Sequence, residues 1–271
     1  MKKYNKAPLP FQGQKRNFLK IFNRELEKLC GDGDGWTIID VFGGSGLLAH
    51  NAKYTCRKAR VIFNDYDNYT ERLLNINKTD QLRLRLRKIT GNKKRCSPLN
   101  IETKNQVINY LKNCEYIDYM TLSGYLLFSG NYFSSIDELE SHKLYDRVSK
   151  YPPSADGYLS GVETVHKSFT EILSDDFKGK VLYLLDPPYI NTMQGYHRDK
   201  SSYFGLLSQL ALFELMKPPF FYFTSNRSEI MDFVENPSVY SHVFENCEIF
   251  TTTNSPNWRS TYLDILIKRL V

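Results

Sequence analysis

The sequence predicts an α/β fold, in which a doubly wound and mostly parallel sheet carries helices on both faces. Five short apolar runs predict its strands, and the first three have the continuous hydrophobicity of strands buried on both faces. The runs occupy residues 37–42, 61–63, 181–185, 220–224 and 262–267. A helical pattern at about residues 204–216 precedes the fourth run, and alternating strands and helices predict a doubly wound sheet. Ligands of such sheets bind outside the carboxyl ends of the strands, so we expect the chemistry just after these runs.

The pattern changes in the middle of the chain. Between residues 68 and 159 the continuous apolar strands disappear and the content of charged, Asn and Ser residues rises, which predicts an inserted, mostly helical region. Residues 151–157 (YPPSADG) combine two prolines with a glycine, which is typical of a turn, and mark the return to the sheet. We therefore expect a sheet domain built from residues 1–67 and 160–271.

The composition argues against a disordered, disulfide-stapled or membrane-spanning protein. With 271 residues and 41% hydrophobic content, the chain can bury a full core. Its 36 basic and 30 acidic residues give a net charge of +6, which fits a polyanionic partner but also an ordinary solvated surface. Five dispersed cysteines without C-x-x-C spacing indicate neither a disulfide framework nor a zinc site, and favour the reducing cytoplasm. No apolar run approaches the roughly 20 residues that cross a bilayer.

A glycine-rich segment follows the first predicted strand. Residues 40–46 (DVFGGSG) and the helix-compatible LLAHNAK after them predict a strand, a tight turn and a helix. Glycines let the backbone approach a ligand closely and adopt positive φ. The segment is not the G-x-G-x-x-G dinucleotide fingerprint and lacks the lysine of a P-loop, so by itself it also fits an ordinary βα turn.

Acidic residues follow the second predicted strand, about 20 residues after the glycines. In the segment NDYD (64–67), Asp65 is placed where a carboxylate can accept hydrogen bonds from ribose hydroxyls. Asn and Asp are also favourable helix N-caps. The two interpretations are compatible, with Asp65 on a ribose and Asp67 at the cap.

The motif Asp186-Pro187-Pro188-Tyr189 ends the apolar run VLYLL. Its prolines fix an extended turn without backbone N–H donors, and Tyr189 offers an aromatic face. The Asp186 carboxylate and a proline carbonyl can each accept one N–H of an exocyclic amino group while the base stacks on the tyrosine. Such acceptors favour a pyramidal nitrogen whose lone pair attacks a sulfonium methyl group, and no metal is needed. The structural alternative is a plain Asp-Pro turn at a strand end.

Taken in order, these motifs resemble those of the Dam-like DNA adenine N6-methyltransferases. The segment PFQGQKR (10–16) is similar to the family's amino-terminal S-adenosylmethionine-binding segment, and DVFGGSG resembles its methionine-binding loop. Asp65 matches the ribose-binding acid, and DPPY matches the catalytic motif. The segment VHKSF (165–169) resembles the position that holds the cofactor adenine, where Ser168 replaces the family's Asp and offers a weaker, neutral acceptor.

The resemblance implies a Rossmann-like S-adenosylmethionine-dependent methyltransferase sheet, with target recognition in the inserted region at 68–159. The implied catalytic residues are Asp186, Pro187, Pro188 and Tyr189. The implied cofactor-binding residues are Phe11, Gly13, Lys15, Asp40, Phe42, Gly44, Gly46, Asp65, Ser168, Phe169 and Asp186. The short segments Ser225-Asn226 and Arg259–Leu266 (RSTYLDIL) also look like later family segments.

Basic residues concentrate in the inserted region, so we expect double-stranded DNA as the partner. Phosphate contacts are expected from Arg83, Arg85, Arg87, Lys93, Lys94 and Arg95. Alternatively, Leu82, Leu86 and Ile89 form the apolar stripe of a helix whose arginines face water. The two interpretations are compatible, although three arginines at every second position cannot share one helical face. Residues 191–202, which include His197, are expected to close over a flipped-out base.

The sequence thus predicts a site-specific DNA adenine methyltransferase that transfers a methyl group from S-adenosylmethionine to N6 of a flipped-out adenine. Cytosine N4, RNA adenine and glutamine amino groups are methylated on related scaffolds, although aspartate as the first motif residue favours adenine. A non-catalytic nucleic-acid-binding relative is the alternative from a different functional class.

Overall fold

The computed structural model describes residues 1–91, 96–128, 131–189, 204–236, 243–257 and 260–271. The described chain forms two compact units. Unit 1 consists of Met1–Lys6, Gly13–Asp67 and Gly157–Val271, and unit 2 consists of Ala7–Gln12 and Asn68–Asp156. The stretch Ala7–Gln12 therefore belongs to unit 2, although the residues on both sides of it belong to unit 1.

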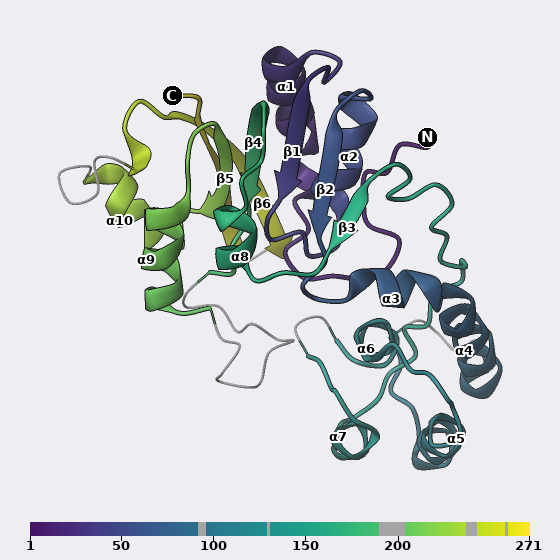
Figure 1. Ribbon diagram of the computed structural model, residues 1–271. Coiled ribbons are helices and arrows are strands. Elements are labelled where there is room, and N and C mark those ends of the chain that lie inside the picture. Colours follow the sequence, from purple (N-terminus) through teal and green to yellow (C-terminus); the bar gives the residue numbers. More distant parts are fainter. Residues whose placement is uncertain (92–95, 129–130, 190–203, 237–242, 258–259) are drawn as a thin grey trace. The chain divides into compact units, whose positions relative to one another are not determined.

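Unit 1 is built on a seven-stranded sheet with the order β3-β2-β1-β4-β5-β7-β6 (Figure 1). Its strands are β1 (Trp36–Asp40), β2 (Arg60–Asn64), β3 (Glu163–Val165), β4 (Lys180–Leu185), β5 (Phe220–Ser225), β6 (Glu248–Asn257) and β7 (Ser260–Arg269). The neighbours from β3 to β5 pair in parallel, whereas β7 is antiparallel to both β5 and β6. The predicted α/β fold with a mostly parallel sheet is confirmed.

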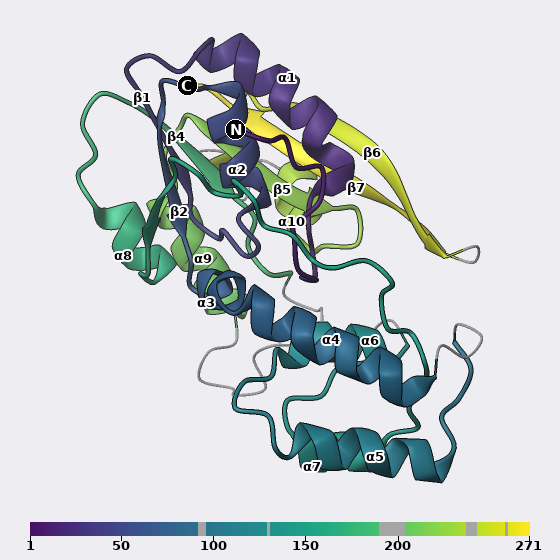
Figure 2. The same cartoon turned by 90° about the vertical axis from the view of Figure 1, so that its right-hand side faces the viewer.

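Helices cover both faces of this sheet, with α1 and α2 on one side and α8 and α9 on the other (Figure 2). The helical segments of unit 1 are η1 (Arg16–Phe18), α1 (Leu19–Cys30), α2 (Leu47–Thr55), α8 (Phe169–Ser174), α9 (Leu206–Leu215) and α10 (Ile230–Glu235). Successive strand side chains point to opposite faces. Thus Tyr222 of β5 joins the apolar cluster formed with α8, α9 and α10, while its neighbour Phe221 packs edge-on against Phe22 of α1.

The strand order reverses between β1 and β4. The connection from β1 to β2 passes through α2, and the connection from β4 to β5 passes through α9 in the opposite direction along the sheet. In open α/β sheets, ligands bind at such a reversal, in the crevice outside the carboxyl ends of the strands. The glycine loop follows β1 and the DPPY motif follows β4, so both predicted motifs lie at this reversal.

The structure differs from the predicted strands mainly at the two edges of the sheet. The five predicted strands are present, although the first ends at Asp40 rather than at Phe42. The edge strands β3 and β6 were not predicted from the sequence. Because β3 is only three residues long and largely exposed, and β6 contains the polar run TTTN, neither has the apolar pattern of a buried strand.

Unit 2 is helical and has its own apolar core. Its helices are α3 (Tyr69–Leu74), α4 (Ile76–Thr90), α5 (Ile101–Leu111), α6 (Tyr119–Leu126) and α7 (Ile136–Ser141). The core gathers side chains of α4, α5, α6 and α7, among them Leu86, Val107 and Leu126. The predicted apolar stripe of α4 is confirmed, because Leu82 and Leu86 are buried there and Ile89 packs against them.

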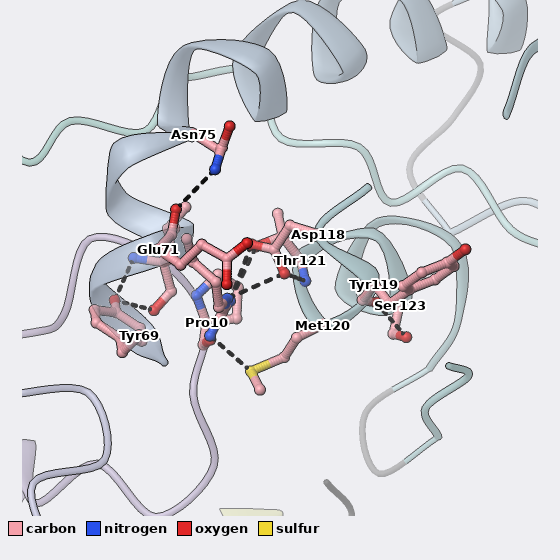
Figure 3. A network of polar contacts seen from close by, with 11 residues as sticks. Pro10, Tyr69, Glu71, Asn75, Asp118, Tyr119, Met120, Thr121 and Ser123 are labelled. Atoms are coloured by element: carbon pink, nitrogen blue, oxygen red, sulfur yellow. Dashed lines mark hydrogen bonds and ion pairs between the residues drawn. The ribbon is translucent and has the colours of Figure 1, made fainter. Parts of the chain in front are cut away.

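A polar network holds the amino-terminal stretch of unit 2 in place (Figure 3). The Arg72 guanidinium donates to both carboxylate oxygens of Asp118, each at 3.1 Å, and to the backbone oxygen of Pro10 at 2.9 Å. The Tyr69 hydroxyl exchanges hydrogen bonds with the backbone N–H and C=O of Leu9, at 2.9 and 3.0 Å. Two side chains of α3 therefore fix a stretch that is distant in sequence, and Asp118, at the start of α6, orients one of them, Arg72.

Candidate functional site

The loop after β1 is a tight turn that favours glycines. Gly44 and Gly46 have positive φ values of 52° and 71°, and the Gly46 N–H donates to the Gly43 oxygen at 2.7 Å. A Cβ atom at Gly43 would lie 2.2 Å from the Phe63 ring and 2.8 Å from the backbone oxygen of Asn64. The loop therefore packs directly on the end of β2, and α2 starts at the next residue, Leu47.

Asn64 joins three loops at the carboxyl edge of the sheet. Its amide nitrogen donates to the backbone oxygens of Val41 and Lys167, each at 2.9 Å, and its oxygen accepts from the Lys167 N–H at 2.9 Å. Next to it, Asp65 is only 3% exposed, and its backbone N–H donates to Val165. The side chain of Asn64 thus fixes the loops after β1, β2 and β3 relative to one another.

Lys15 and the DPPY motif, which are 171 positions apart in the sequence, meet in unit 1. The Lys15 Nζ atom lies 2.7 Å from the Oδ1 atom of Asp186 and donates to the Gly13 oxygen at 3.2 Å. It also lies 5.6 Å from the ring centroid of Tyr189, within range of a cation–π contact. The side chain of Lys15 is 8% exposed and that of Asp186 is 18% exposed, so this ion pair is largely removed from water.

Opposing effects set the ionisation of this pair. Burial acts to lower the pKa of Lys15, but the Asp186 carboxylate and Tyr189 outweigh burial, and the net pKa is raised. Burial raises the pKa of Asp186, and the Lys15 ammonium only partly offsets that effect. Burial likewise raises the pKa of Tyr189 to about 12. At neutral pH the lysine is therefore charged, and Asp186 is more basic than an ordinary aspartate.

Asp40, at the end of β1, is buried with one carboxylate oxygen unsatisfied. Its Oδ2 atom accepts from the Ala49 N–H of α2 at 3.1 Å, whereas Oδ1 has no hydrogen-bond partner among the described residues. Burial, and the like charge of Asp186, raise the pKa of Asp40 to about 7. A buried acceptor without a donor is costly in a folded protein, so this oxygen is a natural point for a cationic or N–H-bearing ligand.

Two of the predicted cofactor-binding aromatic residues lie in contact. Phe42, after β1, stacks on Phe169 at the start of α8, with ring centroids 5.6 Å apart and an angle of 27° between the planes. Phe204 packs against both rings, also at 5.6 Å from each. The sequence did not single out Phe204, because a lone aromatic residue before a helix carries no motif.

Ser168 is the N-cap of α8. Its Oγ accepts from the Glu171 N–H at 3.2 Å, and the Glu171 carboxylate accepts from the Ser168 N–H at 2.7 Å, which completes a capping box. The Ser168 hydroxyl also lies 2.7 Å from the same carboxylate. The serine therefore has a structural role that we did not predict, although Ser168 and Glu171 have the S-x-x-E spacing of a capping box. Its expected contact with a cofactor adenine stays a prediction.

The expected DNA contact of Arg83 is corrected by the structure. Arg83 is 3% exposed, and its guanidinium lies 2.6 Å from Asp80 and donates to the backbone oxygens of Ser149 and Lys150. An arginine whose donors are used inside unit 2 is not available to a phosphate. Arg85 is exposed and Arg87 is half-buried, so their contacts with DNA stay predictions.

Other predicted residues belong to unit 2 or lie outside the described residues. Phe11 belongs to unit 2, where its ring packs edge-on against Tyr69 at 5.9 Å. Lys93, Lys94 and Arg95 lie outside the described residues, as does the segment 191–202 with His197.

Some polar residues beside the site were missed from the sequence. Asp264 of β7 is 7% exposed and acts electrostatically on Lys15, Asp186 and Tyr189. Asn254 of β6 donates to Asp264 at 3.1 Å. The available signal was a carboxylate inside the apolar run YLDILI, which a strand buries only at a cost.

Two negative findings apply to the described residues. None of the helices there is long and apolar enough to span a membrane. No group of three or more His, Cys, Asp or Glu side chains there is arranged to hold a metal ion.

Comparisons with known proteins identify relatives of the chain. A protein of Haemophilus influenzae named "Putative methyltransferase" is 39% identical over 276 residues, which cover 98% of this chain and 93% of that protein. The solved structure of a "putative RNA methyltransferase" from Pyrococcus horikoshii covers 96% of this chain and 87% of its own, with 12% identity and a TM-score of 0.42. A "Putative methyltransferase" structure from Escherichia coli covers 97% of this chain and 92% of its own, with 9% identity and a TM-score of 0.33. Because both TM-scores are below 0.5, these structures say nothing about the substrate.

A family model covers most of the chain. The model of the D12 class N6 adenine-specific DNA methyltransferases matches residues 11–230, a span that includes the glycine loop, Asp65 and the DPPY motif. Together with the relative that matches almost the whole chain, this places the protein among the methyltransferases. The chain belongs to the D12 class N6 adenine-specific DNA methyltransferase family.

Proposed function

We propose that this methyltransferase transfers a methyl group from S-adenosylmethionine to N6 of an adenine in double-stranded DNA. The observation that carries the proposal is the buried pair of Lys15 and Asp186, with Tyr189 beside it, at the carboxyl ends of the strands. The description of the matching family, which names adenine N6 and DNA, supports the same substrate.

The residues at the end of β1 fit a cationic cofactor. Among the described residues, the Oδ1 atom of Asp40 has no hydrogen-bond partner and Lys15 is the ion-pair partner of Asp186, so a positive group would help to balance the two carboxylates. When bound, S-adenosylmethionine supplies a methyl group on a positively charged sulfur. By family resemblance, Asp40 and the glycine loop would hold its methionine part, Asp65 its ribose, and Phe169 its adenine.

Asp186 prepares the target amine for methylation. Lys15 engages Oδ1, so Oδ2 and the carbonyl of Pro187 are the acceptors that would take the two amine N–H groups. These hydrogen bonds localise the lone pair on nitrogen and stabilise the positive charge that develops there during transfer. The Asp186 carboxylate would also be placed to accept the surplus proton of the methylated nitrogen. Tyr189 offers its ring for stacking of the flipped-out base.

Unit 2 is our candidate for DNA recognition. Its helix α4 ends in a row of basic residues, of which Arg85 and Lys88 are exposed and Arg87 is half-buried. The whole chain carries a net charge of +6. Exposed cations on a folded helix suit phosphate contacts, which position a protein on DNA without reading its sequence.

A product analysis tests this proposal. The protein is incubated with S-adenosylmethionine labelled in the methyl group and, in separate reactions, with unmethylated duplex DNA, RNA and protein. The substrates are then digested and the modified residues are identified by mass spectrometry. We expect label in N6-methyladenine from DNA. The variant Asp186→Ala should transfer no label and should stay folded, with a lower melting temperature than the wild type because Lys15 loses its buried partner.

Each alternative product has a distinct meaning. Label only in N4-methylcytosine, RNA or protein would refute the proposed substrate and leave the methyltransferase class intact. Absence of S-adenosylmethionine binding by calorimetry would refute the proposed cofactor. Wild-type turnover by Asp186→Ala would refute the role given to that carboxylate.

A further inference from the structure

Tyr158, a residue that no sequence motif singled out, contacts the glycine loop after β1. Its hydroxyl donates to the backbone oxygen of Ser45 at 2.8 Å, and both residues are buried. On the other side of the same peptide group, the Gly46 N–H donates to the Gly43 oxygen at 2.7 Å. The peptide group between Ser45 and Gly46 is therefore fixed at both its oxygen and its nitrogen.

The residue after Tyr158 also packs on this loop. A Cβ atom at Gly46 would lie 2.9 Å from the Cδ2 atom of Leu159, so the leucine side chain covers the glycine directly. Leu159 has a positive φ of 57°, an unfavourable conformation for a bulky residue. Such a conformation persists only where the surrounding structure holds the backbone. At Leu159 the contact that holds it comes from His50.

His50, in the first turn of α2, bonds to backbone on two sides. Its Nδ1 atom accepts from the Leu159 N–H at 3.2 Å, and its Nε2 atom lies 3.0 Å from the backbone oxygen of Lys2. Because a carbonyl oxygen only accepts, Nε2 carries the proton and Nδ1 does not, so the ring is neutral. Burial lowers the pKa of His50 and so favours the same neutral form.

Aromatic packing fixes the ring of Tyr158. It stacks on the His50 ring, with centroids 4.7 Å apart and an angle of 22° between the planes. Tyr4 packs edge-on against both rings, with its centroid 5.2 Å from that of His50 and 5.0 Å from that of Tyr158. Asn51 of α2 donates to the Tyr4 backbone oxygen at 3.0 Å. Residues of α2 and of the amino-terminal stretch thus direct the Tyr158 hydroxyl at the loop.

We propose that Tyr158 is a positioning residue for cofactor binding, which keeps the glycine loop in its binding conformation by holding the Ser45 carbonyl. This inference rests on the proposed function, in which the loop holds the methionine part of S-adenosylmethionine. The N–H groups of Gly44 and Ser45 have no hydrogen-bond partner in the described part of the chain, so the loop can offer them to the cofactor carboxylate. A loop that is ordered before binding loses less conformational freedom on binding. His50 acts through Tyr158 and Leu159.

The variant Tyr158→Phe tests this role, because it removes the hydroxyl and keeps the ring. We expect calorimetry to show roughly three- to tenfold weaker binding of S-adenosylmethionine, the range that corresponds to one hydrogen bond. In DNA methylation, KM for the cofactor should rise while kcat at saturating cofactor stays unchanged. A hydroxyl with a purely structural role would lower the melting temperature and leave the affinity of the folded protein as it is.

Two control variants separate positioning from stability. Tyr54→Phe on α2 is the matched control, because Tyr54 makes ring contacts with Lys3 and Arg57 that phenylalanine keeps. Glu25→Gln loses buried hydrogen bonds of α1 and shows whether lower stability by itself weakens binding. Both variants should bind the cofactor as tightly as the wild type. Binding by Glu25→Gln that is as weak as that of Tyr158→Phe would assign the effect to stability and overturn the inference.

Substitutions of His50 test the support behind Tyr158. Glutamine has an N–H donor for Lys2 and an oxygen acceptor for Leu159, whereas leucine has neither. We expect His50→Leu to weaken cofactor binding at least as much as Tyr158→Phe, and His50→Gln to recover part of the affinity. Equal affinity of His50→Leu and the wild type would overturn the role given to His50. If neither histidine variant folds, the result for Tyr158→Phe decides the inference.

Amide hydrogen exchange without cofactor separates this inference from the proposed function. The Gly46 N–H, which bonds to Gly43, should exchange faster in Tyr158→Phe than in the wild type. If the wild type does not bind S-adenosylmethionine but this exchange is faster, the proposed cofactor fails and the hold of Tyr158 on the loop stands. Unchanged exchange, or unchanged affinity of folded Tyr158→Phe beside a wild type that binds the cofactor, would overturn the inference alone.

Discussion

At the scale of single residues, Lys15 shows how a buried charge is retained. Burial alone would favour the neutral amine, but the Asp186 carboxylate at 2.7 Å and the Gly13 carbonyl at 3.2 Å keep the ammonium charged and directed. Such a lysine is a counter-ion held in one position, whereas the flexible side chain of a surface lysine adopts many conformations in water. Its loss should therefore change the chemistry of Asp186 more than the surface charge of the protein.

The variant Lys15→Met should lower kcat by about 100-fold, comparable to the loss of one oriented donor in other active sites. Lys15 opposes the effect of burial on Asp186, so without it the pKa of Asp186 rises further. The acid limb of the profile of kcat against pH should consequently move to higher pH. Lys178→Met, at an exposed lysine, is the control. An acid limb that stays in place would contradict the proposed pairing.

At the scale of elements, the glycine turn joins β1, β2 and α2 with no room for another atom. The close contacts of Gly43 with Phe63 and Asn64 make this loop part of the packed sheet edge rather than a surface turn. Backbone that is so constrained presents its N–H groups to a ligand in a fixed geometry. The affinity for the cofactor should therefore depend on this packing.

We expect Gly43→Ala to weaken S-adenosylmethionine binding by at least tenfold and to lower the melting temperature, since its Cβ would lie 2.2 Å from the Phe63 ring. Isothermal calorimetry and thermal unfolding measure the two effects. Gly124→Ala is a matched control, because a Cβ there meets nothing within 4 Å and the helix α6 favours alanine. Equal behaviour of the two variants would contradict the packing account.

A buried ion pair ties α1 to the last strand of the sheet. Glu25 of α1 is 1% exposed and accepts from Lys268 of β7 at 3.2 Å, as well as from Lys28 and Arg24 on its own helix. Burial opposes ionisation, but the three cations outweigh it and lower the pKa of Glu25 from 4.5 to about 2. A carboxyl group with a lowered folded-state pKa stabilises the protein above its unfolded pKa and loses that contribution as the pH falls.

The variant Glu25→Gln should therefore be less stable than the wild type at pH 7, by about 1 to 3 kcal/mol, because hydrogen bonds to a charged group are lost. The difference should shrink as the pH falls from about 4.5 to about 2, where the wild-type carboxylate takes up its proton. Denaturant unfolding at a series of pH values measures the free energy of unfolding for both proteins. A difference that does not depend on pH would rule out this ion pair as its source.

At the scale of the whole molecule, the chain is divided between a sheet unit and a helical unit with separate cores. The segment Ala7–Gln12 lies in unit 2 through its contacts with Arg72 and Tyr69, and the chain continues directly into Gly13 and Lys15 of unit 1. The residues proposed for chemistry and those proposed for DNA contact are therefore encoded in different units of one chain. Substitutions in unit 2 should change DNA binding without changing the chemistry.

We expect Arg85→Gln to weaken DNA binding and to reduce the slope of log K against log salt by about 1, the change for one lost phosphate contact. Arg83→Gln, two residues away, should instead lower the melting temperature, because its guanidinium is bonded to Asp80 and to backbone oxygens. Fluorescence anisotropy with labelled duplex DNA at several salt concentrations measures the first effect, and thermal unfolding measures the second. A reduced salt slope for folded Arg83→Gln would overturn the structural role assigned to it.

Much of the fold could be predicted from the sequence because buried parallel strands are continuous apolar runs. The glycine turn and the DPPY motif were placed correctly at strand ends, since both are local features of the chain. The edge strands β3 and β6 were missed, because an exposed strand does not need an apolar pattern. Arg83 was misassigned for a related reason: alternating Leu and Arg residues do not reveal which arginine the surrounding helices bury.

The sequence by itself determined which chemical groups this protein has: an aspartate after a buried strand, a glycine turn and a family-specific order of motifs. Only the tertiary structure decided which of them meet. Lys15 pairs with Asp186, and Asn64 bridges three loops. The physical reason is that burial and charge pairing depend on distances between residues far apart in the chain, and these distances arise only when the sheet assembles.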